Sequence, residues 1–164
     1  RKDSRLTWAQ KKLPWYSLHR LGKPSNHQKN KIVTNSFFNS SKFSFDNIGY
    51  FVPTGGVLGV AINEIDPYLL LGYLNSKIVL YFLRSISSPK RGGYISLDVG
   101  TLSEVSIPVF SSSSKTKISK IVQSILECTE DDQKILELEN EMNDEVFNAY
   151  DFTNEELDFL KKII

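Results

Sequence analysis

The segment Tyr68–Val79 reads Tyr-Leu-Leu-Leu-Gly-Tyr-Leu-Asn-Ser-Lys-Ile-Val. Asp66 and Pro67 come immediately before it, and Asp at the N-cap followed by Pro at the first helical position is a strong helix start. Apolar residues lie all around the helix that this segment would form, which predicts burial on most sides. We therefore predict one long central helix over residues 67–85, with the polar run Asn75–Lys77 at its middle.

Short strand patterns come before the predicted helix. Lys31–Thr34 is a strand candidate, and Phe43–Asp46 alternates apolar and polar residues as a half-buried strand does. Asn47–Gly49 is a turn signal, after which Tyr50–Val52 is expected to return as the second strand of a hairpin. The nearly all-apolar run Val57–Ile62 is typical of a strand at the centre of a sheet. These patterns predict an α+β fold in which an irregular mixed or antiparallel sheet packs on the long helix.

The chain after the long helix is expected to alternate between loops and short regular elements. A polar loop is predicted over Ser87–Gly93, a strand over Tyr94–Leu97 and a short helical turn over Val99–Glu104. Residues Val105–Val109 are then expected to leave this region as a further strand that passes through Pro108.

The last third of the chain has helical periodicity. A first amphipathic helix is predicted by apolar residues spaced i, i+3, i+4, i+7 and i+8: Ile118, Ile121, Val122, Ile125 and Leu126. A second helix is predicted by Ile135, Leu138, Met142 and Val146. The run Ser111–Ser114 is a linker or the approach to an N-cap, and Thr153–Glu156 has the form of a capping box that opens a last helix through Ile164. We therefore divide the chain into a first domain, residues 1–110, and a C-terminal helical segment, residues 111–164, that packs on it.

Composition excludes several classes of protein. The length of 164 residues suits one domain with a small appendage, and 24% charged residues are typical of a globular protein. Because Cys128 is the one cysteine and only His19 and His27 accompany it, the sequence holds no internal disulfide and no zinc-type ligand set, so a reducing, cytoplasmic setting is expected. The polar and charged residues within 68–86 are costly in a lipid bilayer, which disfavours a membrane span there.

Motifs that carry catalytic chemistry are missing from the sequence. It contains no phosphate-binding glycine loop, no Gly-x-Ser-x-Gly nucleophile elbow, no His-Glu-x-x-His pair and no Cys-x-x-Cys. We therefore expect this chain to be non-catalytic, with no metal and no cofactor of its own. Since it begins at Arg1 rather than at Met, we also expect a fragment or a processed product, so that an active site can lie elsewhere in the parent protein.

The net charge of +1 conceals an uneven distribution along the chain. Residues 1–42 carry ten Lys and Arg against one Asp, a net charge of +9. Residues 127–158 carry thirteen Asp and Glu against one Lys, a net charge of −12. Such asymmetry indicates one face that binds a polyanion and another face that must avoid it.

Residues in two regions are candidates for nucleic-acid contact. Lysine and arginine neutralise phosphates and release counterions, a role that suits Lys11, Lys12, Arg20, Lys29, Lys31 and Lys42. Asn and Gln pair with adenine edges, and Arg or Lys with guanine edges, so Gln28 and Asn30 are candidates for base readout. The loop after the long helix would bring two cations and an aromatic ring to a DNA groove: Lys90, Arg91 and Tyr94. For any single lysine, a solvated surface position remains the alternative.

A series of short motifs follows in order along the chain: Trp15-Tyr16-x-Leu18 with Arg20, Lys31-Ile32-Val33, Phe43-x-x-Asp46-x-x-Gly49-Tyr50-Phe51, Tyr68-Leu69-Leu70-x-x-Tyr73-Leu74-Asn75-Ser76-Lys77, Gly92-Gly93-Tyr94, Leu102-x-x-Val105-x-Ile107-Pro108, and a helical ending from Asp144 to Glu156. Over residues 8–160 this order resembles the TaqI-like specificity (target recognition) domain. That domain follows the catalytic domain in many adenine-specific DNA methyltransferases and fused restriction-modification enzymes.

The resemblance implies both a fold and a function. It implies an irregular mixed sheet with packed helices that reads bases mainly from the major groove of double-stranded DNA. Residues 1–110 would then be the target recognition domain of an adenine-specific restriction-modification methyltransferase, in some parents with an endonuclease. The Asn/Asp-Pro-Pro-Tyr/Phe motif and the S-adenosylmethionine motif of the family belong to a preceding methyltransferase domain, and neither motif occurs here. That domain is the second expected partner, and S-adenosylmethionine would bind to it.

Alternatives remain open at this point. One half of a type I restriction specificity subunit uses a similar fold, although long helical spacers would mark it and the C-terminal helices here look short and capped. A protein-interaction module would instead use the acidic C-terminal helices as its docking face. We interpret Asn75–Lys77 as a structural polar cluster that stabilises the long helix against a neighbouring turn, in preference to a DNA contact.

Overall fold

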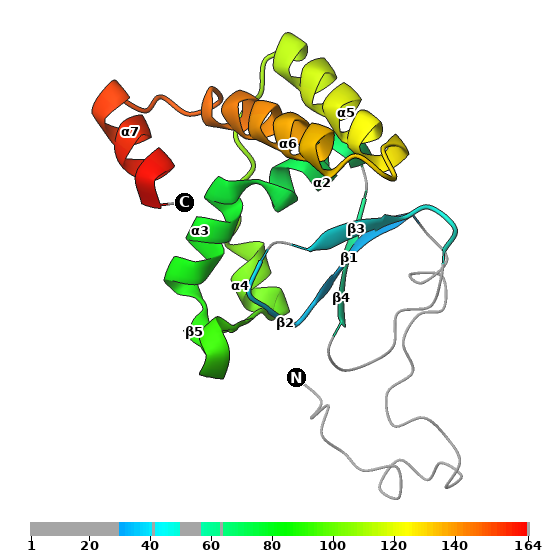
Figure 1. Cartoon of the computed structure of the whole chain (residues 1–164). Coiled ribbons are helices and arrows are strands. Elements are labelled where there is room, and N and C mark those ends of the chain that lie inside the picture. The colour runs from blue at the N-terminus through cyan, green and yellow to red at the C-terminus, as the bar shows by residue number, and fades with distance from the viewer. Residues whose placement is uncertain (1–29, 41, 50–56, 63, 164) are drawn as a thin grey trace, which may run out of the picture.

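The computed structural model describes residues 30–40, 42–49, 57–62 and 64–163 of the chain. Within these residues, six α-helices pack with two three-stranded antiparallel sheets (Figure 1). This combination of elements confirms the predicted α+β class. The division of the chain at residue 110 stays a prediction.

The larger sheet has β1 at its centre. Its strands, in spatial order, are β3 (Phe43–Asp46), β1 (Lys31–Asn35) and β4 (Val57–Ala61). Both outer strands run antiparallel to β1, so that Ile32 lies opposite Phe45 on one side and Val60 on the other. The three strands predicted in these segments are therefore confirmed.

Strand β4 lies at the edge of this sheet among the described strands, although its apolar sequence predicted a central position. The central position is therefore not observed among the described strands, because an apolar run does not reveal how many neighbouring strands will pair with it. Leu58 and Val60 pack against the core, whereas Gly59 between them is exposed. The return strand predicted over Tyr50–Val52 lies outside the described residues.

A second sheet is smaller. Its strands, in spatial order, are β2 (Phe37–Phe38), β6 (Ile95–Ser96) and β5 (Ser88–Pro89). Phe38 and Ile95 lie opposite each other and are both buried. The strand predicted over Tyr94–Leu97 is thus confirmed in a shorter form, and part of the predicted polar loop forms strand β5.

The predicted long helix is two helices, α2 (Pro67–Asn75) and α3 (Lys77–Ile86), bent by 60° relative to each other. The predicted start is confirmed, because Asp66 Oδ1 accepts the N–H of Leu69 at 2.8 Å and Pro67 occupies the first turn. No single helix in the described part of the chain is both long and apolar enough to cross a membrane; α2 and α3 meet that criterion only when the bent pair is taken together.

The bend occurs at Ser76, where the prediction of a continuous helix was wrong. Ser76 has an extended backbone, with φ −67° and ψ 152°, and its own N–H donates to the carbonyl oxygen of Tyr73 at 3.0 Å. Its buried hydroxyl donates to the same carbonyl at 2.6 Å. The side chain therefore satisfies an acceptor at the end of α2, which leaves the backbone free to turn into α3.

Asn75 and Lys77 hold the bend against two other elements. The Asn75 carboxamide accepts the N–H of Phe43 and donates to the carbonyl of Phe43, both at 3.0 Å, and it also donates to the carbonyl of Leu71 at 3.1 Å. The N–H of Lys77, the first residue of α3, donates to Asn143 Oδ1 at 2.7 Å. The interpretation of this polar run as structural is confirmed, although its partners are strand β3 and the last long helix, not a turn.

Four further helices complete the described chain: α4 (Val99–Ser103), α5 (Ser112–Glu127), α6 (Asp132–Phe147) and α7 (Asn154–Ile163). All four were predicted. Ser111 caps α5 by accepting the N–H of Ser114 at 3.1 Å. The capping box before α7 is formed as predicted: the N–H of Thr153 donates to Glu156 Oε2 at 2.8 Å, and the N–H of Glu156 donates to Thr153 Oγ1 at 3.3 Å.

Residues Val105–Val109 do not form the strand that was predicted for them. The carbonyl of Ser106 accepts the hydroxyl of Tyr73 at 2.6 Å, so it is paired with a helix side chain, and Pro108 has no N–H to donate to a neighbouring strand. This segment instead connects α4 to α5 without a sheet partner among the described residues.

Helix α2 is the centre of the core, between the larger sheet and the α5–α6 pair (Figure 1). Its buried residues meet buried apolar residues of α5 and α6: Ile118, Ile121, Val122, Met142 and Val146. Gly72 lies at the closest approach of these helices. A β-carbon added at Gly72 would lie 2.8 Å from Val122 Cγ2, 2.9 Å from Ile118 Cγ2 and 3.2 Å from the Met142 sulfur.

Replacing Gly72 by Ala is expected to lower the free energy of unfolding by about 1–3 kcal/mol, because the added methyl group overpacks the contact between α2 and α5. This loss should occur even though Ala favours an exposed helix by about 1 kcal/mol over Gly. Urea unfolding followed by circular dichroism measures it. In the Gly72→Ala background, Val122→Ala should cost less than it does alone, and strictly additive losses would contradict the proposed overlap.

Candidate nucleic-acid interface

The residues Lys90, Arg91 and Tyr94 lie together at the tip of the hairpin formed by β5 and β6. Ser88 pairs with Ser96 in this hairpin, and Pro89 pairs with Ile95. The N–H of Lys90 donates to the carbonyl of Tyr94 at 2.7 Å and closes the tip. The structure therefore brings the three predicted residues of this loop into one small element, which we call the Lys90–Tyr94 tip.

Two glycines allow the chain to turn within the Lys90–Tyr94 tip. The short 3-10 turn η1 (Arg91–Gly93) contains Gly92 with φ 78° and Gly93 with φ 76°. Both values lie in the left-handed region that residues with a β-carbon rarely adopt. The order Arg-Gly-Gly-Tyr thus places a long cation directly before the reversal of the chain and an aromatic ring directly after it.

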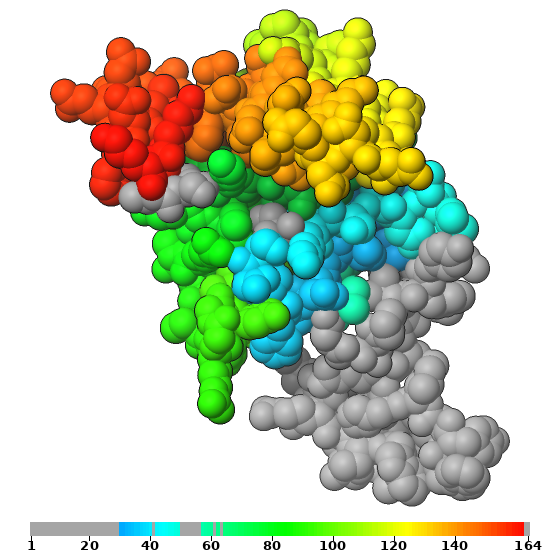
Figure 2. All heavy atoms as spheres, in the orientation of Figure 1, coloured from blue at the N-terminus to red at the C-terminus, as the bar shows by residue number. Residues whose placement is uncertain are grey.

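All five residues of the tip are exposed, and neither Lys90 nor Arg91 forms an ion pair with a carboxylate of the described residues. In Figure 2, the end of α3 and the segment after it project from the lower left of the molecule. A projecting two-stranded ribbon is one of the shapes that the DNA major groove, about 12 Å wide, admits.

The base of this hairpin is anchored to the core. Phe38 and Ile95 are buried on its inner face, and the N–H of Leu97 donates to the carbonyl of Ser36 at 2.7 Å. The N–H of Ser87 donates to the carbonyl of Leu83 at 2.9 Å, which ties the start of the hairpin to the end of α3. Packing of this kind fixes the direction in which the Lys90–Tyr94 tip points.

A negative charge follows the hairpin at Asp98. Its Oδ1 accepts the N–H of Thr101 at 2.8 Å and caps helix α4. This hydrogen bond holds the pKa of the Asp98 carboxyl below its ordinary value. Asp98 therefore remains ionised at neutral pH and adds one negative charge beside the base of the hairpin.

Two other predicted contact residues lie elsewhere on the described surface. Asn30 is exposed immediately before β1. Lys42 is exposed before β3, where it lines a groove of about 640 Å³ that also involves Lys77 of α3 and the helices α5 and α6. Lys42 is thus part of a different concavity from the Lys90–Tyr94 tip.

Lys31 does not present its charge at the surface. It is 3% exposed and forms an ion pair with Asp46, which is 9% exposed and lies directly opposite in the register of β1 and β3. The other carboxylate oxygen of Asp46 accepts the N–H groups of Ile48 and Gly49 at 3.1 and 2.9 Å. Because this pair stabilises the interior and the turn after β3, we remove Lys31 from the candidate interface.

The remaining predicted contacts lie outside the described residues: Lys11, Lys12, Arg20, Gln28 and Lys29. They stay predictions that rest on charge and residue type. In the described part of the chain, no group of three or more His, Cys, Asp and Glu side chains is arranged to hold a metal ion.

Sequence reasoning assigned no role to Arg84, which supports the base of the hairpin indirectly. Its guanidinium donates to the carbonyl of Asn39, in the connection between β2 and β3. This bond links α3 to the strand that pairs with β6. No local pattern identifies such a contact, because the two residues are 45 positions apart.

Comparison with models of protein families identifies the family of the chain. Residues 4–109 match the family model of the TaqI-like C-terminal specificity domain. The match covers more than half of the chain and includes both sheets, helices α2 to α4 and the Lys90–Tyr94 tip. None of the curated proteins compared with the chain matches it.

Proposed function

The chain belongs to the TaqI-like C-terminal specificity domain family, and on that basis we propose that it recognises the target sequence of a restriction-modification DNA methyltransferase. In this proposal the chain binds double-stranded DNA and transfers no methyl group itself. An adjoining methyltransferase domain, adenine-specific and dependent on S-adenosylmethionine, carries out the reaction on the DNA that this chain positions.

The observation that carries this proposal is the Lys90–Tyr94 tip, which lies inside the matched region. Arg91 at the tip has the fork of donors that pairs with the O6 and N7 atoms of guanine in the major groove. Lys90, one residue nearer to the anchored strand, suits a phosphate contact. The chain would therefore combine one residue that discriminates between bases with one that adds affinity for any sequence.

The double change Lys90→Ala with Arg91→Ala is expected to weaken duplex binding roughly 10- to 100-fold near physiological salt, because it removes a base contact and a phosphate contact. Fluorescence anisotropy with a duplex that the unchanged chain selects from a random pool, repeated across a salt series, measures the effect. Losing one phosphate contact should also make the slope of the logarithm of the association constant against the logarithm of the salt concentration shallower by about 0.9.

A matched control is available on α5, where Lys115 and Lys120 are exposed. Lys115→Ala with Lys120→Ala removes the same charge and should leave affinity almost unchanged. Equal losses in both double variants would show that only net charge matters and would contradict a role for the tip. Selection of bound duplexes should yield a consensus that becomes degenerate at one position in Arg91→Ala; a chain that selects no consensus would contradict sequence recognition.

A further inference from the structure

Helix α3 has one wide apolar face, only part of which is buried. Val79 and Leu83 are buried in the core. Directly beside them, Ile78, Tyr81, Phe82 and Ile86 form a stripe with helical spacing, in which Tyr81 is 40% exposed and Phe82 is 36% exposed. A surface helix ordinarily carries polar residues on its outer face, so this second stripe requires an explanation.

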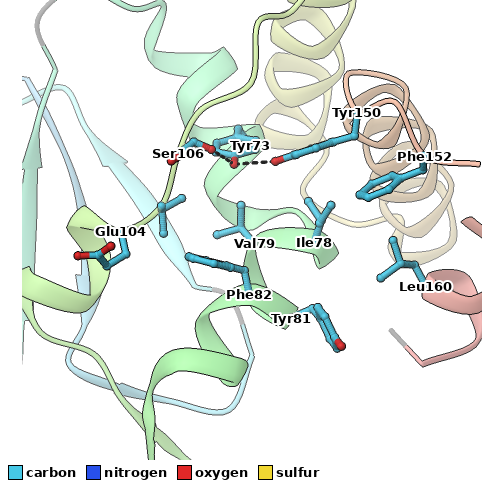
Figure 3. A pocket seen from close by; sticks show the side chains of 11 residues that line it. Tyr73, Ile78, Val79, Tyr81, Phe82, Glu104, Ser106, Tyr150, Phe152 and Leu160 are labelled. Carbon is cyan, nitrogen blue, oxygen red and sulfur yellow. Dashed lines mark hydrogen bonds between the residues drawn. The ribbon is translucent and has the colours of Figure 1, made fainter. Parts of the chain in front are cut away.

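Three residues of this stripe, Ile78, Tyr81 and Phe82, form one wall of an apolar cavity of about 330 Å³ (Figure 3). Figure 3 shows Ile78, Val79 and Phe82 on one side of this space and Phe152 and Leu160 on the other. A second cavity of about 350 Å³ shares Phe152 and Leu160 and continues along α7 to Phe159. We call the two together the α3–α7 groove, with these apolar walls: Ile78, Tyr81, Phe82, Phe152, Phe159 and Leu160.

The back of the α3–α7 groove is held in place by hydrogen bonds. The hydroxyl of Tyr73 donates its one proton to the carbonyl of Ser106 at 2.6 Å, so the hydroxyl of Tyr150, 2.9 Å away, must donate to the oxygen of Tyr73. Burial raises the pKa of Tyr73, and the bond with Tyr150 raises it further. The hydroxyl of Tyr73 therefore stays neutral, and the two hydrogen-bonded phenols connect α2, the segment before α5 and the segment before α7.

Acidic residues lie at the border of the α3–α7 groove. Glu104 borders the first cavity, and Glu155 and Glu156 border the second. The Glu156 carboxylate accepts both the N–H and the hydroxyl of Thr153, at 2.8 and 3.0 Å, which lowers its pKa. The groove thus carries fixed negative charge at both ends, which disfavours DNA as its occupant.

We propose that the α3–α7 groove binds an amphipathic helix of a partner protein that carries Lys or Arg beside its apolar face. The apolar side chains of that helix would cover Phe82 and Phe159, and its cations would lie beside Glu104 and Glu155. The part of the stripe that lines the groove, from residue 78 to residue 82, is about 6 Å long, which suits about one turn of such a helix against this wall. This arrangement is helix-in-groove recognition with charge complementarity around the groove.

A second copy of the chain is a poorer match among the described helices. Helix α5 carries Lys115, Lys117 and Lys120, but its apolar face is buried against α2. The groove also lies towards α7, whereas the Lys90–Tyr94 tip follows the opposite end of α3 (Figure 1). The proposed partner is therefore separate from the DNA contact and does not depend on it.

The test uses the full chain and a fluorescein-labelled synthetic helix with Leu and Phe at i, i+3, i+4 and i+7 and Lys at the flanking positions. Micromolar binding is expected, about 10-fold weaker for a matched peptide with Glu in place of Lys. Phe82→Glu and Glu155→Lys should each weaken binding about 10-fold. Leu136→Glu is the control, because Leu136 is 51% exposed on α6 outside the groove.

Specific outcomes would overturn this proposal. Equal binding of the Lys and Glu peptides would do so, as would binding that Phe82→Glu and Leu136→Glu affect equally. A dimer in sedimentation that Phe82→Glu converts to a monomer, with no peptide binding, would assign the groove to a second copy. If Phe82→Glu does not fold, Phe159→Glu takes its place in each of these comparisons, because Phe159 is 59% exposed. Duplex binding measured on the same samples reports the proposed DNA function separately.

Discussion

Replacing Lys31 by Met is expected to lower the free energy of unfolding by about 3–5 kcal/mol, because it breaks the buried ion pair between Lys31 and Asp46. Met keeps the length of the lysine stem, so the loss reports the charge more than the packing. The measurement is urea unfolding at neutral pH, followed by circular dichroism. The exposed Lys42 provides the matched control, and Lys42→Met should change stability by less than about 0.5 kcal/mol.

A double variant separates the ion pair from its surroundings. Lys31→Met with Asp46→Leu replaces both charges by apolar groups, and such replacements are often close to neutral. The double variant should therefore be clearly more stable than the sum of the two single losses predicts. It will retain some deficit, because Asp46 also accepts the N–H groups of Ile48 and Gly49. Additive losses would contradict the dominant role of the pair.

The same variant tests whether Lys31 contacts DNA. If its role is internal, folded Lys31→Met protein binds duplex DNA as tightly as the unchanged chain under conditions where both are fully native. A variant with unchanged stability and weakened DNA binding would return Lys31 to the interface. The sequence does not decide this question, because Lys31 and Lys42 flank the same stretch of strands and differ only in whether a carboxylate faces them across the sheet.

Elements that depend on local chemistry were predictable from the sequence. The spacing of apolar residues predicted α5 and α6, and the capping box at Thr153–Glu156 located the start of α7. Period-two alternation found β3 as well. In the candidate interface, the Gly92-Gly93 pair indicated a tight turn between a cation pair and an aromatic ring, and the structure forms that turn.

Features that depend on distant partners were not predictable. The bend at Ser76 is stabilised by Asn75, which bonds Phe43 at a separation of 32 residues, and by Lys77, which bonds Asn143 at a separation of 66. Apolar residues around the segment predicted burial on most sides, whereas α3 leaves Tyr81, Phe82 and Ile86 exposed. The residue pattern of one segment does not predict which of its faces will pack against another helix or strand.

Asn75→Asp is expected to lower the free energy of unfolding by about 3 kcal/mol at neutral pH, since buried carbonyl groups left without a donor cost about 1–3 kcal/mol each. The amide nitrogen of Asn75 now donates to the carbonyls of Phe43 and Leu71. In the variant, a carboxylate oxygen of almost the same size faces those two carbonyls. The change therefore removes two hydrogen bonds and adds repulsion without altering the volume of the side chain.

The dependence on pH gives this prediction a sign that a general loss of packing would not give. Repulsion by the two carbonyls raises the pKa of the new carboxyl in the folded state above its unfolded value, so the folded state binds the proton more tightly. The deficit of Asn75→Asp should therefore be complete at neutral pH and should shrink as the pH falls through the folded pKa, where the protonated acid can donate again.

Asn154→Asp is the control. This residue is exposed in the first turn of α7, so the change adds the same charge and should keep stability within about 0.5 kcal/mol of the unchanged chain. A deficit that is constant with pH would contradict the contact with Phe43 and Leu71 as its cause. Because α3 connects this bend to the Lys90–Tyr94 tip, a loosened bend should also weaken duplex binding, whereas Asn154→Asp should not.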